Sequence, residues 1–89
     1  MPRTSYSAVY SKWLGGRIRE ARSAVGITQA ELARRLEVSG AYIAAVEAGR
    51  ENLTIGQLAA IAEALKVVLD ITFTVPAPEY ELLNSTTAG

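Results

Sequence analysis

The 89-residue chain contains neither cysteine nor histidine, and these two absences remove much catalytic and metal-binding chemistry. Without cysteine there are no disulfides and no thiolate zinc sites. Without histidine the chain lacks the commonest general base and metal ligand. We therefore expect a protein that is not an enzyme and has no cofactor or metal. The chain also lacks an apolar run near 18 residues and a signal-peptide pattern, so we expect no membrane partner and a cytoplasmic location.

The net charge is zero, but the charges are distributed unevenly along the chain. Residues 1–35 carry seven Lys/Arg against two acidic residues, a net charge of +5. Residues 36–89 carry two Lys/Arg against seven acidic residues, a net charge of −5. This asymmetry predicts one face that attracts phosphate and one that repels it, although ordinary solvated helix faces would give the same counts.

The most informative stretch runs from Thr28 to Gly49 and predicts two short helices around a three-residue break at 37–39. Thr28 is a good N-cap, and a glutamate three residues later completes a capping-box pattern. Ser39 can cap the second helix, and Gly49 is placed to end it. The apolar positions of the two helices are Leu32, Ala33, Leu36, Ile43 and Val46. Two short helices joined by a tight turn are typical of a helix-turn-helix, whose second helix enters the DNA major groove.

Further helices are expected on both sides of this stretch. Residues 1–10 are predicted to be a flexible, Ser-rich arm in which Arg3 supplies positive charge. Ser11 can cap a helix that runs to about Ala24 and is followed by Gly26 as a stop signal. The inward positions of this helix would be Leu14, Ile18, Ala21 and Val25. Residues 11–66 form the predicted helix-turn-helix domain.

A second capping box opens the last predicted helix. Thr54 is followed three residues later by Gln57, which is the required spacing. The inward positions would be Leu58, Ile61, Ala62 and Leu65.

The pattern changes after Lys66. Apolar residues alternate over 67–75, at Val67, Leu69, Ile71, Phe73 and Val75, and this period of two favours a β-strand over a fifth helix. A lone strand needs a hydrogen-bonding partner. We therefore predict that it pairs with the same strand of a second copy across a two-fold axis, giving a homodimer. Prolines end the strand, and residues 76–89 are predicted to be a disordered tail.

Taken together, these patterns make the stretch from Leu14 to Leu65 resemble the lambda-repressor-like (Cro/CI, XRE-type) helix-turn-helix family. The resemblance covers more than half of the chain. The residues that carry it are Leu14-Gly15, Ile18-Arg19, Arg22, Thr28-Gln29, Glu31-Leu32-Ala33, Val38-Ser39, Ile43, Glu47, Gly49, Leu58 and Ala62. The expected fold class is therefore mainly α, with one C-terminal strand that pairs across a dimer. A strand and tail appended to this domain further resemble the HipB-type antitoxins.

The resemblance implies roles for particular residues, with double-stranded DNA as the partner. Gln29 matches a position that contacts phosphate and helps to hold the recognition helix. Arg50 and Asn52 match backbone-contacting positions in the following loop. Arg22 and Glu47 match a structural ion pair that maintains the fold without contacting DNA. The groove-facing positions are Ser39, Gly40, Ala41, Tyr42 and Ala45.

At these groove-facing positions the chain departs from the family pattern, because several of the residues there have small side chains. Alanine cannot form a bidentate hydrogen bond to a base and can only contact a thymine methyl group. Two modes of binding remain open. The helix can lie unusually close to the bases and select DNA by shape, or phosphate contacts can supply most of the affinity with modest discrimination. The third possibility is that the domain no longer reads DNA.

We expect a repressor that binds an inverted repeat as a dimer. One rival is an antitoxin that binds a toxin protein and represses its own operon. Another is a protein-interaction module that has lost DNA binding. Trp13 and Tyr10 are expected to pack in the core of the first helix rather than on a partner.

Overall fold

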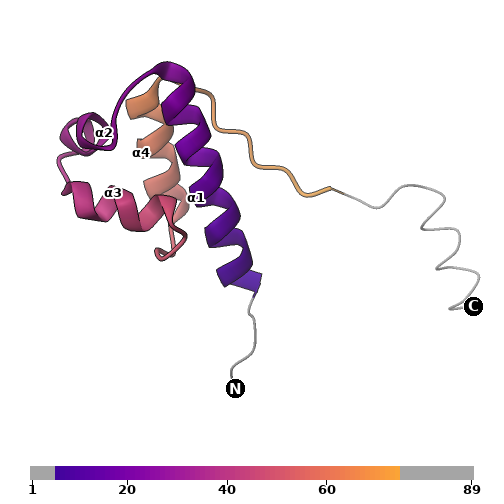
Figure 1. Ribbon diagram of the computed structural model, residues 1–89. Helices are drawn as coiled ribbons and strands as arrows, with labels where there is room; N and C mark the ends of the chain where they lie inside the picture. The colour runs from indigo at the N-terminus through magenta and orange to yellow at the C-terminus, as the bar shows by residue number, and fades with distance from the viewer. Residues whose placement is uncertain (1–5, 75–89) are drawn as a thin grey trace, which may run out of the picture.

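The computed structural model describes residues 6–74, and four α-helices account for most of them (Figure 1). The helices are α1 (Tyr6–Val25), α2 (Gln29–Leu36), α3 (Gly40–Glu47) and α4 (Ile55–Leu65). α1 packs against α3 and α4, while α2 packs against α3 and α4. None of these helices is long and apolar enough to cross a membrane.

The first helix begins earlier than the sequence predicted. It starts at Tyr6, so residues 6–10 belong to α1 and not to a flexible arm, and Ser11 lies inside the helix instead of capping it. The remainder of the predicted arm, residues 1–5, lies outside the described residues. α1 ends at Val25, where Gly26 adopts a positive φ of 79° and donates its backbone N–H to the Arg22 carbonyl. Gly26 is therefore the predicted stop signal.

The predicted N-caps of the other three helices are confirmed. Of the two predicted capping boxes, however, the one at Thr28 and Glu31 is not complete, because the Glu31 carboxylate accepts from Arg34 and Arg35. The Thr28 hydroxyl accepts the backbone N–H of Glu31 at 3.0 Å, and Ser39 accepts that of Tyr42 at 3.0 Å. Thr54 and Gln57 form a complete capping box. These short polar side chains satisfy backbone donors that the first turn of a helix leaves unpaired. They explain why three short helices begin where they do.

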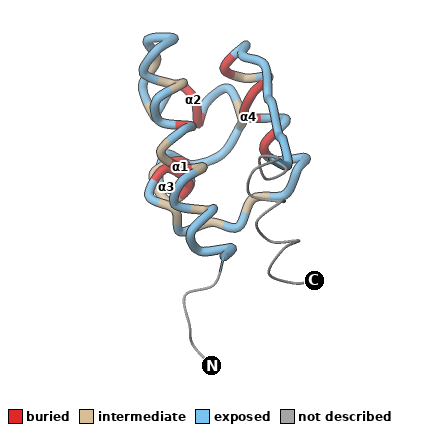
Figure 2. Tube along the Cα trace, turned by 90° about the vertical axis from the view of Figure 1, so that its right-hand side faces the viewer, coloured by how far each residue is buried: buried red, intermediate tan, exposed pale blue. Residues whose placement is uncertain are grey.

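One hydrophobic core joins all four helices, and its residues lie on the inward sides of the helices (Figure 2). The buried members are Ile18, Leu32, Ala33, Ile43, Val46, Leu58, Ile61 and Leu65. Leu32, Ile43 and Val46 are the largest fully buried side chains, so α2 and α3 contribute the centre of the core. Val25, which was predicted to face inward, is instead exposed at the end of α1.

The segment after α4 leaves the helical domain. Within the single chain, residues 67–74 form neither the predicted strand nor the alternative fifth helix. A strand is defined by hydrogen bonds to a neighbouring strand, and one protomer supplies none to these residues. The Thr72 hydroxyl donates to Asp70 Oδ1 at 3.2 Å, a hydrogen bond between two exposed side chains of the segment. Val75 and the predicted tail, 76–89, lie outside the described residues.

The aromatic residues of α1 are not in the core, contrary to the sequence-based expectation. Tyr10 and Trp13 are 61% and 60% exposed, and Tyr6 is 84% exposed. The core-facing side of α1 is formed by Leu14, Gly15, Ile18 and Ala21, which leaves no place for the larger rings. These three aromatic residues therefore lie on a part of α1 that no other segment of residues 6–74 covers.

Candidate nucleic-acid interface

The turn between α2 and α3 fixes the direction of α3. Glu37 adopts the left-handed conformation, with φ 59° and ψ 44°, and ends α2. The next residue, Val38, donates its backbone N–H to the Ala33 carbonyl at 3.0 Å, and Ser39 then begins α3 as its N-cap. This closed three-residue turn is the predicted break at 37–39. It presents α3 at an angle to α2, as Figure 1 shows.

One side of α3 is buried and the other carries small side chains. Ile43 and Val46 face the core, while Ser39, Gly40 and Ala41 are exposed. Ala45 is half-buried. Because the exposed side bears no long side chain in its first turn, its backbone can approach a flat or grooved surface closely.

Tyr42 lies differently from its exposed neighbours. Its side chain is half-buried and packs against the core cluster. Of the five predicted groove-facing residues, Tyr42 is therefore the one with a packing role in the protomer. Its contact with the core limits how far the ring can swing outward.

A buried ion pair holds α3 to α1. Arg22 Nε lies 2.6 Å from Glu47 Oε2, and Arg22 Nη2 lies 3.1 Å from Oε1, so the contact is bidentate. Gln29 Nε2 donates to the same Oε1 at 3.0 Å. The Arg22 and Glu47 side chains are 13% and 3% exposed. One carboxylate thus joins the end of α3 to α1 and to the first residue of α2.

Both members of this pair are held in their charged forms. Burial by itself raises the pKa of the Glu47 carboxyl, but hydrogen bonds from Arg22 and Gln29, with the positive charges of Arg22 and Arg19, outweigh it. The net result is a pKa below the ordinary value of 4.5. The hydrogen bond to Glu47 in turn raises the pKa of Arg22. The charge-assisted hydrogen bonds therefore persist at neutral pH.

A glycine allows α1 and α3 to approach closely enough for this pair to form. A Cβ built on Gly15 would lie 2.6 Å from the Glu47 carbonyl oxygen and would also overlap the Val46 carbonyl. Only a residue without a side chain fits at this crossing. Gly15 is one of the family-like residues of the sequence, but no role could be predicted for it, because nothing in a helical pattern identifies what another helix places opposite it.

The loop after α3 lies against the N-terminal half of α1. Gly49 has a φ of 82°, and a Cβ there would lie 2.5 Å from the Lys12 Cα. The Ser11 hydroxyl donates to Asn52 Oδ1 at 3.4 Å. Arg50 and Asn52 are both exposed. The structure thus brings the predicted loop residues beside Lys12, a basic residue that the sequence analysis did not select.

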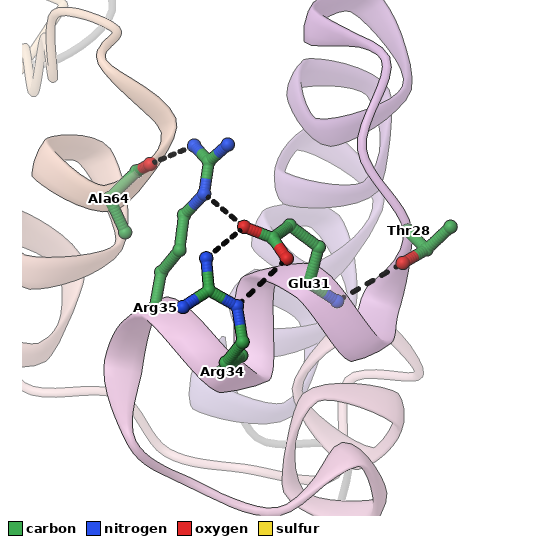
Figure 3. Close-up of polar contacts among 5 residues, drawn as sticks. All are labelled: Thr28, Glu31, Arg34, Arg35 and Ala64. Atoms are coloured by element: carbon green, nitrogen blue, oxygen red, sulfur yellow. Dashed lines mark hydrogen bonds and ion pairs between the residues drawn. The ribbon is translucent and has the colours of Figure 1, made fainter.

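Much of the positive charge of α2 is already paired within the chain (Figure 3). Glu31 accepts hydrogen bonds from Arg34 at 2.6 and 3.0 Å and from Arg35 at 2.9 Å. Arg35 also donates to the Ala64 carbonyl at 2.9 Å, which ties α2 to the last turn of α4. The hydrogen bonds from Arg34 and then Arg35 lower the pKa of Glu31 to about 2.

The unpaired cations are therefore fewer than the sequence counts suggested. Arg17 pairs with Glu20 at 3.2 Å on the exposed side of α1. Among residues 6–74, the cations outside ion pairs are Lys12, Arg19, Arg50 and Lys66. Two of them lie near the loop after α3: Lys12 packs against Gly49, and Arg50 is the next residue of that loop. Within the same residues no cluster of acidic side chains could hold a metal ion.

The comparisons with known proteins agree with this geometry. Residues 13–70 match the helix-turn-helix domain family, and the chain belongs to that family. Its helix-turn-helix is of the XRE type. An uncharacterized transcriptional regulator in the ATPase CF(0) region of Rhodospirillum rubrum is 39% identical over 61 residues, which cover 68% of this chain and 56% of the relative. The chain thus spans about half the length of that curated relative.

Solved structures with the same fold include two restriction-modification controller proteins. C.AhdI from Aeromonas hydrophila is 30% identical with a TM-score of 0.65, covering 68% of this chain and 88% of its own. A mutant of the controller protein C.Esp1396I is 28% identical with a TM-score of 0.61, covering 96% of this chain and 100% of its own. A chain of a HipA-HipB-O2-O3 complex is 24% identical, with a TM-score of 0.60 over 83% of this chain and all of its own, and it shows the fold alone.

Proposed function

We propose that this protein binds double-stranded DNA as a homodimer and represses transcription from a short inverted repeat. The observation that carries the proposal is the rigid presentation of α3, whose small-residue side is exposed while the buried Arg22–Glu47 pair fixes its other end. A protein of this class places such a helix in the major groove. Regulators of this kind work where the DNA lies, which in bacteria is the cytoplasm.

The proposed contacts divide into two groups. Ser39, Gly40, Ala41 and Ala45 face the bases, with Tyr42 contributing the exposed part of its ring. Because these side chains are short, selectivity comes from thymine methyl contacts, close backbone approach and DNA shape more than from bidentate hydrogen bonds. Arg50, Asn52 and Gln29 hold the sugar-phosphate backbone, and Lys12 joins them. Gln29 does so while one of its amide hydrogens remains bonded to Glu47.

The dimer is proposed to form through residues 67–75. The described part of this segment runs away from the helical domain (Figure 1) and is exposed, with Phe73 95% exposed. Pairing of two such segments across a two-fold axis would satisfy their backbone groups. The two recognition helices would then lie roughly 34 Å apart, so the half-sites would be about 10 bp apart centre to centre.

The role of strand pairing can be tested with Ile71→Pro. Proline removes a backbone donor and is poorly accommodated in a paired strand. We expect a monomer in sedimentation analysis, with helical content unchanged and weaker binding to the operator. A variant that remains fully dimeric would contradict the strand-pairing mode of assembly.

Toxin neutralisation is the alternative function. The two controller proteins match at 30% and 28% identity, whereas the HipA-HipB-O2-O3 complex matches at 24% and supports only a shared fold. This difference favours a free-standing regulator. A toxin protein that co-purifies with the chain in stoichiometric amount would reverse the preference.

The direct test is a selection from sheared genomic DNA of the source organism. Purified protein is incubated with the fragments, and bound DNA is recovered at about 150 mM salt, because non-specific phosphate binding falls steeply with salt. We expect enrichment of an inverted repeat with the half-site spacing given above. Recovery without any enriched sequence would contradict a sequence-specific repressor and favour the protein-interaction role.

A further inference from the structure

We propose that the exposed aromatic face of α1 is the docking surface for the C-terminal segment of a second copy of this chain. We define the aromatic face as Tyr6, Tyr10 and Trp13, and the C-terminal segment as residues 67–74. The inference rests on the proposed dimer and identifies the surface against which its paired segments would lie.

The aromatic face is a continuous stripe on one side of α1. Its members are four and three residues apart, a spacing that brings side chains to the same side of a helix with about 3.6 residues per turn. On the same helix, Gly15 and Arg22 face α3. The helical period places the aromatic face roughly opposite those residues, away from the proposed DNA-binding side.

This stripe is unusual in its exposure. Its three rings are 84%, 61% and 60% exposed in the protomer. Arg17 lies one turn further along the same side, 5.8 Å from the centre of the Trp13 ring. Contiguous exposed aromatic side chains, flanked by a charged residue, are typical of a protein interaction surface.

The C-terminal segment is a second uncovered apolar surface on the same molecule. Val68, Ile71 and Phe73 are 91%, 53% and 95% exposed. The segment leaves α4 and runs outward on the side of α1 that is away from α2 and α3 (Figure 1). Both apolar surfaces therefore face away from α3, yet within one protomer neither covers the other.

Physical requirements of the paired segments favour a second copy as the occupant. A two-stranded sheet alone is only marginally stable in water, and packing its apolar face against a helix is one way to stabilise it. Eight extended residues span about 26 Å, which exceeds the roughly 10 Å of helix axis between Tyr6 and Trp13. Each paired segment is thus long enough to cross the aromatic face of its partner.

Charge near the two surfaces favours the same arrangement. The C-terminal segment carries one charged residue, the exposed Asp70, and the aromatic face is flanked by Arg17, whose guanidinium lies over the Trp13 ring. Docking of the segment on this face therefore brings groups of opposite charge to the same surface. Because each copy is neutral overall, no long-range repulsion opposes the encounter.

The only tryptophan of the chain lies on this face, so the unmodified protein can report on docking. We expect the Trp13 emission maximum to move to shorter wavelength as the protein is concentrated, in parallel with dimer formation measured by sedimentation. The monomeric Ile71→Pro variant should show no such shift. Dimer formation without a change in Trp13 emission would overturn the inference while leaving the proposed dimer intact. Absence of a dimer at any concentration would overturn both.

Disulfide mapping identifies the occupant, because the chain has no cysteine of its own. Trp13→Cys and Ile71→Cys are made in separate proteins of distinguishable mass, mixed and oxidised. We expect a mixed disulfide between the two chains. As a matched control, Ser23→Cys places the thiol at an exposed α1 position outside the aromatic face and should give at least tenfold less mixed product.

Two other products would contradict the inference. Disulfides that form only between two Ile71→Cys chains would show that the segments pair away from α1. An intrachain disulfide in a chain that carries both cysteines, with no mixed product between chains, would show docking within one protomer.

Discussion

The two sides of α1 differ in how completely other parts of the protomer pack against them and pair their polar groups. On the side toward α3, Gly15 allows close contact and Arg22 meets a buried carboxylate with two hydrogen bonds. On the other side, Tyr6, Tyr10 and Trp13 remain exposed. One protomer is therefore sufficient to position α3, whereas no other element within residues 6–74 covers the opposite side of α1.

The largest effect is expected from Glu47→Ala, which removes the carboxylate at the centre of the α3-facing side. It leaves Arg22 largely buried without its ion-pair partner, and loss of one member of a buried pair costs about 3–5 kcal/mol. Denaturant unfolding monitored by circular dichroism measures this change in the free energy of unfolding. Glu31→Ala is the matched control, since it also removes a carboxylate that binds arginine, but at the surface. It should have a much smaller effect, and equal losses would contradict the distinction between the two sites.

A smaller effect is expected from Gly15→Ala. The added Cβ would overlap backbone carbonyl groups of α3, and such overpacking typically costs about 1–3 kcal/mol. Gly16→Ala is the control one residue away, where no atom lies within 4 Å of the added Cβ. Because alanine is the better helix former, Gly16→Ala should stabilise the protein by about 0.5–1 kcal/mol. Thermal unfolding would contradict the proposed close approach if both variants shifted the midpoint in the same direction.

Acid should weaken the protein through its two paired carboxylates. The pKa values of Glu47 and Glu31 are both lower in the folded chain than the ordinary value of 4.5, that of Glu31 reaching about 2. A lowered folded pKa gives stability that is present above pH 4.5 and is lost as the pH falls toward the folded value. We therefore expect the free energy of unfolding to decline between about pH 4.5 and 2. Glu31→Gln should flatten this decline, and an unchanged slope would contradict the role of Glu31.

The smallest effect is expected on the salt dependence of DNA binding. Gln29→Ala together with Arg50→Ala should weaken binding to all sequences and lower the slope of log affinity against log salt by roughly one unit, because one cationic phosphate contact is lost. Lys66→Gln removes an exposed cation at the end of α4 and serves as the control for total charge. If the double variant and the control behave alike, the DNA-binding surface lies elsewhere.

The sequence predicted those parts of the fold that depend on local chemistry. Thr28, Ser39 and Thr54 cap their helices as expected, since a cap needs only a short polar side chain beside the first turn. The start of α1 was misplaced at Ser11 because residues 6–10 carry no inward apolar pattern. Their large apolar side chains are exposed, and a helix of this kind cannot be recognised from core-facing periodicity.

Other features depend on residues that are distant in the sequence. The Arg22–Glu47 contact and the part of Gln29 in holding α3 were expected only through family resemblance. The Gln29–Glu47 hydrogen bond itself and the close approach at Gly15 required the packed helices to be seen. The alternation over 67–75 shows that this segment is suited to a strand. Whether it becomes one depends on a second chain, which the sequence of one protomer does not contain.

The most direct test of DNA recognition by α3 compares the affinities of two protein variants for the selected inverted repeat. Each variant carries one added negative charge. Ala41→Glu places a negative charge on the exposed side of α3, and Ala60→Glu places the same charge on an exposed position of α4. If α3 lies in the major groove, Ala41→Glu should lower affinity by at least about tenfold through repulsion from phosphate, while Ala60→Glu stays close to the unsubstituted protein. Equal affinity of the two variants, with both fully folded, would contradict recognition of DNA through α3.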